Sequence, residues 1–202
     1  KVGASLQLLQ VKNHANAFTG PVASTISRSS NMFVHGEYRN RTRDKRWDME
    51  LYGEFYALGQ YAGNYKVMAN MKTLLSNKLG YLELGFENVN RTPSYVFDSA
   101  TAFPSVRNIP LKPENITHLS GAWDIPRLKL KLSGHYFLTT NYSYFTDFYH
   151  VNQETGLFNL LRLGLNKTFN LGKRWRWYSD VYLQLTAGNV PVHLPTIYTR
   201  NR

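Results

Sequence analysis

The sequence predicts an all-β protein, an antiparallel transmembrane β-barrel of about ten strands. Three observations support this fold class. Apolar and polar side chains alternate along many segments, the prolines fall between those segments, and short connections alternate with longer ones. The chain has 202 residues, 43% of them hydrophobic, with a mean hydropathy of −0.40, and it contains no run of ~18 apolar residues. A membrane-spanning helix is therefore excluded.

The clearest alternation runs over residues 47–59. The odd positions, beginning with Trp47, are apolar or small, whereas the even positions, beginning with Asp48 and Glu50, are mostly acidic or phenolic. Such a period of two is the pattern of a strand with two different faces. The same pattern predicts strands at 65–75, 81–87, 128–138 and 175–187, and weaker versions predict strands near 2–11, 32–39, 115–125 and 157–170 and one that begins near Thr196.

The breaks between these segments are consistent with a barrel. The prolines lie outside the predicted strands, at positions 21, 93, 104, 110, 113, 126, 191 and 195. A proline inside a strand would remove a ladder hydrogen bond. Tight turns are expected near 40–46, 76–79, 125–127 and 171–174, with mostly longer connections near 12–31, 61–63, 91–114, 141–156 and 189–195. Short turns at one end and longer loops at the other are typical of transmembrane barrels.

Four tryptophans indicate which end of the barrel carries the short turns. Trp47, Trp123, Trp175 and Trp177 lie on apolar faces, within a few residues of a predicted tight turn. Tryptophan favours the boundary between hydrocarbon and headgroups, where an apolar ring meets water. We therefore expect these residues to form a membrane-interface girdle at the periplasmic rim. Tryptophans that cap the core of a soluble protein would give a similar pattern.

The polar faces of the predicted strands are expected to line the interior of the barrel. Charges buried there must be paired or hydrated, because an unpaired buried charge costs several kcal/mol. A wall facing a water-filled lumen and a wall that only fixes strand register both fit this pattern. The predicted lumen-lining residues are Asp48, Glu50, Glu54, Lys66, Lys72, Glu83, Glu87, Lys129, Lys131, His135, Arg162, Arg176 and Asp180.

Tight hairpin turns would bring several of these side chains next to one another. We assume a turn at Asn77-Lys78 and another at Pro126 with Asp124 opposite Lys129. Opposite charges directly across a ladder stabilise a sheet by about 0.2–1 kcal/mol per pair. The expected neighbours are Lys72 with Glu83, Met68 with Glu87, Ala122 with Lys131, His118 with His135 and, diagonally, Arg162 with Asp180.

The net charge of +11, from 24 Lys and Arg against 13 Asp and Glu, initially suggests a nucleic-acid partner. The surplus gathers away from the strands, at residues 39–46, at Lys173 and Arg174, and at Arg200 and Arg202. A nucleic-acid interface would interleave basic residues with exposed stacking aromatics on one surface. We therefore expect no nucleic-acid partner and, instead, contacts between these basic residues and the phosphates of outer-membrane lipid.

The sequence contains no pattern that points to catalysis or to a cofactor. The chain has no cysteine, which excludes a disulfide scaffold, thiol catalysis and zinc held by cysteines. Its six histidines are dispersed, and only His118 and His135 are expected close together, without a nearby carboxylate to complete a metal site. No nucleophile stands out with its base. The sequence therefore predicts a protein that is not an enzyme and holds no cofactor or metal.

The second half of the chain resembles the putative-porin family of Bacteroidota. The resemblance spans about half the chain and is carried by the runs Leu163-Gly164-Leu165-Asn166-Lys167, Trp175-Arg176-Trp177-Tyr178, Asn189-Val190-Pro191-Val192 and Thr199-Arg200-Asn201. It implies an outer-membrane β-barrel of a Gram-negative bacterium and passive diffusion of small polar solutes, and it transfers no catalytic residue. Chains of this family are longer, so we expect residues 1–202 to form a single β-barrel domain that is part of a larger barrel.

Two other functions fit the same sequence. One is a non-conducting barrel that acts as a structural subunit or partner in an outer-membrane protein complex. Its aromatic-rich connections, 91–114 and 141–156, would dock other outer-membrane proteins or fold inward as a plug. The other is a soluble all-β domain that binds glycans through the same aromatics. Solubility without detergent would favour the glycan-binding domain, and silence in a planar bilayer would favour the structural barrel.

Overall fold

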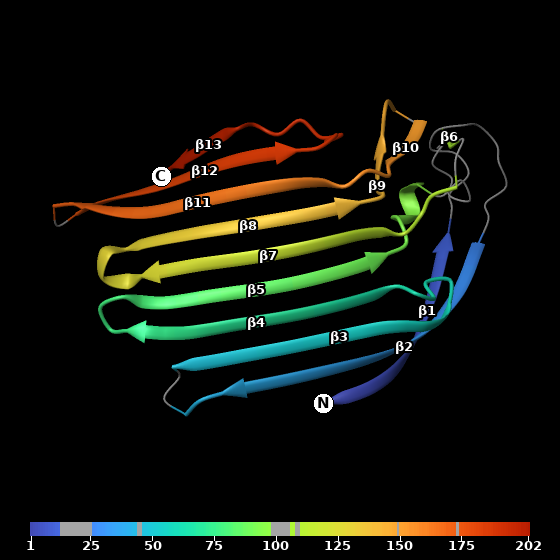
Figure 1. Cartoon of the computed structure of the whole chain (residues 1–202), viewed down its shortest axis with the longest axis horizontal. Coiled ribbons are helices and arrows are strands. Elements are labelled where there is room, and N and C mark those ends of the chain that lie inside the picture. The colour runs from blue at the N-terminus through green and yellow to red at the C-terminus, as the bar shows by residue number, and fades with distance from the viewer. Residues whose placement is uncertain (13–25, 44–45, 98–105, 108–109, 149, 173) are drawn as a thin grey trace.

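A computed structural model describes residues 1–12, 26–43, 46–97, 106–107, 110–148, 150–172 and 174–202. These residues form a ten-stranded sheet and a three-stranded sheet (Figure 1). The large sheet consists of β1 (Val2–Lys12), β2 (Ile26–Arg41), β3 (Trp47–Gly59), β4 (Tyr65–Ser76), β5 (Gly80–Arg91), β7 (Glu114–Ile125), β8 (Leu130–Thr140), β11 (Phe158–Leu171), β12 (Trp175–Ala187) and β13 (Ile197–Asn201). The small sheet consists of β6 (Val106–Arg107), β9 (Tyr142–Phe145) and β10 (His150–Glu154), and two short 3-10 helices, η1 (Tyr95–Phe97) and η2 (Pro126–Leu128), lie in connections.

The large sheet is an antiparallel meander in which spatial neighbours follow one another along the chain. The turns β2–β3, β4–β5, β7–β8 and β11–β12 lie at one end, and the longer connections β5–β7 and β8–β11 lie at the other (Figure 1). We call these the turn end and the loop end. The alternation of connections predicted from the sequence is therefore confirmed. Among the described residues, no helix is long and apolar enough to cross a membrane.

The predicted strands agree closely with the structure. The segments 47–59 and 175–187 coincide with β3 and β12, and the other eight are found within a few residues, except that β2 begins well before residue 32. β8 begins at Leu130 because the residues before it form η2 and Lys129 has a φ of 50°. The described prolines all lie outside strands, and Pro21 and Pro104 lie outside the described residues.

Side-chain pairing across the sheet was predicted in part. Lys72 is opposite Glu83 and Met68 is opposite Glu87, as expected. The register between β7 and β8 was wrong by two residues because η2 lengthens the turn. Asp124 is opposite Lys131, and the observed pairs are Ala122 with Ser133 and His118 with Phe137. Arg162 and Asp180 are not diagonal neighbours either, since Arg162 is opposite Gln184 and Asn166 is opposite Asp180.

The two faces of the large sheet differ in chemistry and in exposure. One face, here called the apolar face, carries large apolar side chains that are exposed, including Leu84 (47% exposed), Phe86 (40%) and Leu119 (45%). The other, the polar face, carries the charged positions of the same strands. Among the described residues only Ile125, Val151 and Phe158 are buried hydrophobic side chains. A soluble sheet would bury its apolar face under a second layer, whereas this face remains uncovered.

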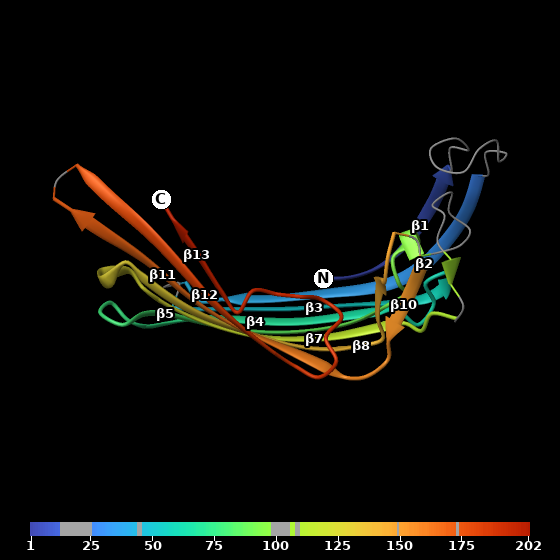
Figure 2. The same ribbon diagram turned by 90° about the horizontal axis from the view of Figure 1, so that it is seen from above.

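The large sheet is bent into a trough (Figure 2). β1 pairs with β2 and β13 pairs with β12, so within the described residues β1 and β13 are the two edges and the sheet is not closed. β9 and β10 rise from the loop end on the side toward which the edge strands curve (Figure 2). The sequence did not predict this small sheet, which lies within the connections expected at 91–114 and 141–156.

A buried asparagine ties three strands together at the loop end. Asn31, on β2, is 1% exposed. Its amide nitrogen donates to the side-chain oxygen of Gln7 on β1 at 3.3 Å, and its oxygen accepts from the backbone N–H of Tyr61, just after β3, at 2.9 Å. Gly59 lies directly opposite Asn31 with a φ of 105°. A Cβ at Gly59 would lie 2.0 Å from the backbone oxygen of Ser30.

Candidate functional site

The polar face brings together almost all the side chains that the sequence predicts to line the lumen. Strand pairing places twelve of them on this one face: Asp48, Glu50, Glu54, Lys66, Lys72, Glu83, Glu87, Lys131, His135, Arg162, Arg176 and Asp180. The thirteenth, Lys129, lies in the turn before β8, where its Nζ donates to Oδ1 of Asn170 at 2.9 Å. Whether this face borders a lumen stays a prediction.

The charges of the polar face form a network that runs sideways across the strands. Near the turn end, the Glu83 carboxylate on β5 lies between two lysines, with Nζ of Lys72 at 2.6 Å and Nζ of Lys131 at 3.4 Å. On β3, Asp48 pairs with Arg39 at 3.0 Å and with Arg41 at 3.5 Å. Such direct pairing fixes the register of each hairpin, because a slip by one residue would move the charges to the apolar face.

A second ion pair lies further toward the loop end. Nζ of Lys66 on β4 is 2.7 Å from the Glu87 carboxylate on β5. A hollow of about 400 Å³ lies on the polar face between β2 and β8. Its lining includes Arg39, Asp48, Lys72, Glu83, Lys131 and His135. This surface therefore offers paired charges and hydroxyl and amide groups to water or to a polar solute.

Positive and negative groups balance on the polar face, in contrast to the excess of basic residues in the whole chain. Its basic residues in the described strands are Arg39, Arg41, Lys66, Lys72, Arg91, Lys131, Arg162, Arg176 and Arg200. Its acidic residues there are Glu37, Asp48, Glu50, Glu54, Glu83, Glu87, Glu114, Asp124 and Asp180. The described strands of this face therefore carry no net charge, and the surplus comes from other parts of the chain. The expectation that Arg39, Arg41 and Arg200 lie away from the strands is wrong, because they belong to β2 and β13 and face this side of the sheet.

Two histidines meet on the polar face although they are not directly opposite. Nε2 of His118 lies 3.1 Å from Nδ1 of His135, and His118 also stacks on Phe137 with ring centroids 4.2 Å apart. The sequence suggested no carboxylate near this pair, which is wrong, since Glu87 lies 3.8 Å from Nδ1 of His118. Within the described part of the chain, no group of three or more His, Asp or Glu side chains is arranged to hold a metal ion.

All four tryptophans lie at the turn end, on the apolar face. Trp47 and Trp175 begin β3 and β12, and Trp123 lies near the end of β7. Their side chains remain accessible, with Trp175 75% and Trp177 45% exposed. The Trp123 indole N–H donates to the backbone oxygen of Leu79 at 2.7 Å, so its polar group has a partner while the side chain remains partly exposed. This arrangement supports the predicted girdle, whose contact with a membrane stays a prediction.

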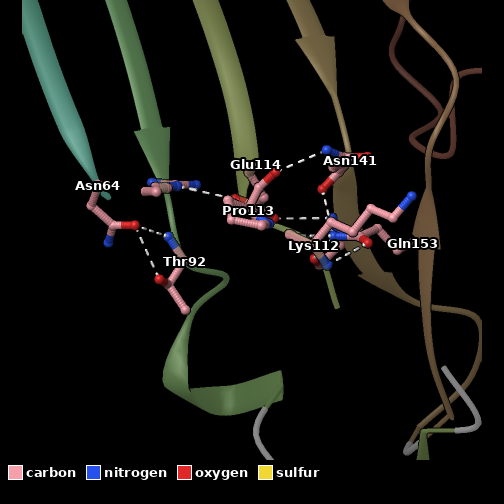
Figure 3. Close-up of polar contacts among 9 residues, drawn as sticks. Asn64, Thr92, Lys112, Pro113, Glu114, Asn141 and Gln153 are labelled. Atoms are coloured by element: carbon pink, nitrogen blue, oxygen red, sulfur yellow. Dashed lines mark hydrogen bonds and ion pairs between the residues drawn. The ribbon is translucent and has the colours of Figure 1, made fainter. Parts of the chain in front are cut away.

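The loop end contains a polar junction that the sequence did not reveal (Figure 3). The Glu114 carboxylate, at the start of β7, accepts from Nε of Arg91 on β5 at 3.0 Å and from the backbone N–H of Ser143 on β9 at 3.0 Å. The Gln153 side chain, on β10, accepts from the backbone N–H of Lys112 at 2.9 Å and donates to its oxygen at 2.7 Å. Glu114 lies at the boundary of a long connection, where alternation gives no signal.

Two asparagines complete this junction (Figure 3). Asn141, with a φ of 56°, turns the chain from β8 into β9 and donates to the backbone oxygen of Pro113 at 2.9 Å. Asn64 accepts from the backbone N–H of Thr92 at 3.0 Å and from its hydroxyl at 3.1 Å. Asparagine suits such positions because it tolerates positive φ and offers both a donor and an acceptor. Side chains therefore hold together the described segments of the loop end.

Comparison with known proteins agrees with this architecture. A family model described as "Putative porin" matches residues 4–202, nearly the whole chain. No curated protein and no solved structure matches. Porins are outer-membrane β-barrels whose strands present an apolar face outward and a polar face inward. The long antiparallel meander, the exposed apolar face and the family match together show that this chain belongs to the putative porin family.

Proposed function

We propose that this protein forms a pore for the passive diffusion of small polar solutes across the outer membrane. The observation that carries the proposal is the division of the large sheet into an exposed apolar face and a polar face of paired charges. In a membrane barrel the apolar face contacts lipid and the polar face lines water. Uncovered carboxylates, lysines and amides give a polar solute replacement hydrogen bonds along its path.

The same reasoning leads us to propose that the large sheet is part of a wider barrel. The outer edges of β1 and β13 carry backbone groups that have no partner strand among the described residues. In hydrocarbon, each unpaired backbone group costs several kcal/mol, so membrane sheets close. About ten strands closing alone would leave an interior mostly filled by side chains, whereas wider barrels hold water. Additional strands between the two edges would satisfy both requirements.

Two measurements test the pore. The detergent-extracted protein is expected to migrate faster on a gel before heating than after, as folded barrels do, and to conduct ions in a planar lipid bilayer. A barrel that shows the shift in migration yet stays silent after good reconstitution would contradict the pore. That result would favour the structural subunit, whose docking surface would include the 93% exposed side chain of Phe148 in the β9–β10 connection.

Removing the charge of Glu83 is expected to change the ion preference of the pore. Glu83→Gln leaves Lys72 and Lys131 without their shared carboxylate, so the local potential becomes more positive and anions are favoured. The reversal potential under a salt gradient should shift toward that of the anion. Asn77→Lys, in the exposed β4–β5 turn, makes the same change in net charge away from the polar face and serves as the control. Equal shifts in the two variants would contradict the proposed lining.

A further inference from the structure

We propose that the small sheet of β6, β9 and β10 is a fixed constriction at the loop end of the pore, held in place by Glu114 and Gln153. The proposal rests on the pore function above and adds a determinant of solute size. Glu114 and Gln153 act as positioning residues, since they hold the small sheet and need not touch the solute. Three observations support this: the burial at the junction, the side of the large sheet on which it forms, and its hydrogen bonds.

Burial is concentrated at the junction between the two sheets. Six of the buried side chains among the described residues lie here. In a sheet with no second layer, side chains on both faces normally remain accessible to solvent, so this burial requires another element packed against the sheet. The six side chains are Glu114 (2% exposed), Ser143 (3%), Val151 (6%), Thr139 (6%), Gln153 (7%) and Phe158 (9%). Three of them belong to the small sheet and three to the ends of β7, β8 and β11. The small sheet is therefore packed against the large one.

The packing takes place on the polar face. Thr139 on β8 is directly opposite Phe158 on β11 and opposite Ile116 on β7, and this row lies on the same face as His135 and Arg162. Glu114 precedes Ile116 by two residues and therefore shares its face. The Tyr142 ring of β9 meets the Phe158 ring edge-on, with centroids 5.8 Å apart. The small sheet thus stands on the side of the wall that would face the solute.

The hydrogen bonds at the junction resist displacement of the small sheet. Glu114 links β5, β7 and β9 through its two carboxylate oxygens. The Gln153 side chain makes two hydrogen bonds to the Lys112 backbone. Its amide nitrogen also lies 2.9 Å from the backbone oxygen of Asn141 and 3.2 Å from the hydroxyl of Ser143. Opening the junction would leave these donors and acceptors without hydrogen-bond partners, and an unsatisfied buried polar group destabilises the fold. The small sheet is thus a permanent part of the wall, not a lid.

Bilayer recordings with neutral polymers of graded size test the constriction in the full chain. Polyethylene glycols that enter a pore lower its conductance, so the smallest excluded polymer reports the width. In Glu114→Ala and in Gln153→Ala, the single-channel conductance should rise and the exclusion limit should shift to larger polymers. Asn77→Ala, in the exposed β4–β5 turn at the opposite end of the sheet, is the control and should leave the exclusion limit unchanged.

Thiol labelling tests the packing independently of conductance, because the chain has no cysteine of its own. A thiol introduced by Thr139→Cys should be protected from a water-soluble thiol reagent, whereas one introduced by Ser133→Cys, further along the same face of β8, should react. Adding Glu114→Ala should expose the thiol at position 139. Folding of each variant is checked by the heat-dependent gel shift.

The outcomes separate the two proposals. A folded wild-type barrel without conductance would overturn the pore and the constriction together. A conducting pore in which neither Glu114→Ala nor Gln153→Ala moves the exclusion limit, although the thiol at position 139 becomes reactive, would overturn the constriction alone. A reactive thiol at position 139 in the presence of intact Glu114 and Gln153 would show that the small sheet does not pack on the polar face and would also overturn it.

Discussion

Leu119→Lys is expected to lower the free energy of unfolding in lipid vesicles by about 2–4 kcal/mol, the cost of a lysine near the middle of the lipid-facing surface of a barrel. Leu119 is near the centre of β7, 45% exposed on the apolar face, and opposite Phe86 and Tyr136. No acidic neighbour lies directly across from it to pair with the new charge. Denaturant titration of the folded protein in phospholipid vesicles measures the change.

Two companion variants make this prediction specific to face and depth. Ser120→Lys places the same charge one residue away on the polar face, opposite Gly85 and His135, and should cost far less. Leu132→Lys is on the apolar face but directly opposite Trp123, which puts it at the level of the girdle, where the expected cost falls to about 0–1 kcal/mol. Equal losses for Leu119→Lys and Ser120→Lys would mean that the faces have been assigned the wrong way round.

Gly59→Ala is expected to destabilise the barrel by about 3 kcal/mol or more. The φ of 105° is unfavourable for any residue with a Cβ, which costs roughly 1–3 kcal/mol, and overpacking costs a similar amount. The added methyl would lie 2.7 Å from Cα of Asn31 and closer still to the Ser30 backbone oxygen, and neither backbone atom can move aside cheaply. The fully buried Asn31 would lose its bonds to Gln7 and Tyr61 as the strands separate.

Gly63→Ala is the matched control for this prediction. Gly63 also has a positive φ, of 88°, but a Cβ there would have no atom within 4 Å. Its cost should be limited to backbone strain, roughly 1–3 kcal/mol, so the difference between the two variants isolates the collision with β2. The loss of the folded, fast-migrating gel band as temperature rises provides the measurement. Identical melting of both variants would rule out the collision as the cause.

Alternation predicted the large sheet well because each long strand has one exposed apolar face and one polar face. β3 and β12 each contain more than ten residues, so a period of two is unmistakable in their sequences. The same length made it possible to predict which face of a strand carries most of its charged residues. The predicted lumen-lining set therefore lies together on one face, with Lys129 as the exception because a positive φ places it in a turn.

Register was harder to predict than face. A period of two is unchanged by a shift of two residues, so alternation could not distinguish Ala122 opposite Lys131 from Asp124 opposite Lys131. The register of this hairpin is set by the turn of 3-10 helix that begins at Pro126. A proline in a short connection does not by itself predict such a helix. In the hairpin between β4 and β5 the turn is one residue longer than the assumed Asn77-Lys78 turn, since Ser76 pairs with Gly80. Lys72 is nevertheless opposite Glu83, as predicted, because a bulge between Leu74 and Ser76 restores the register.

The junction at the loop end had no sequence signal. β6 and β9 are two and four residues long, too short for a period to be recognised, and β6 pairs with β10 more than forty residues away. Glu114, Gln153 and Asn31 are polar residues whose importance comes from burial, and burial depends on which segments meet in space. These side chains could be found only once the connections had been placed.

The meander topology has a consequence for the order in which this protein is assembled. Each strand of the large sheet pairs with the strand of this sheet that precedes it in the chain, and the hairpins β2–β3, β4–β5, β7–β8 and β11–β12 each close over a short turn. The growing sheet always presents one free edge as a template for the following hairpin. The small sheet is different, since β6 must wait for β10, which is made much later. The small sheet is therefore completed only after β7, β8 and β9, which lie between β6 and β10 in the sequence, have been made.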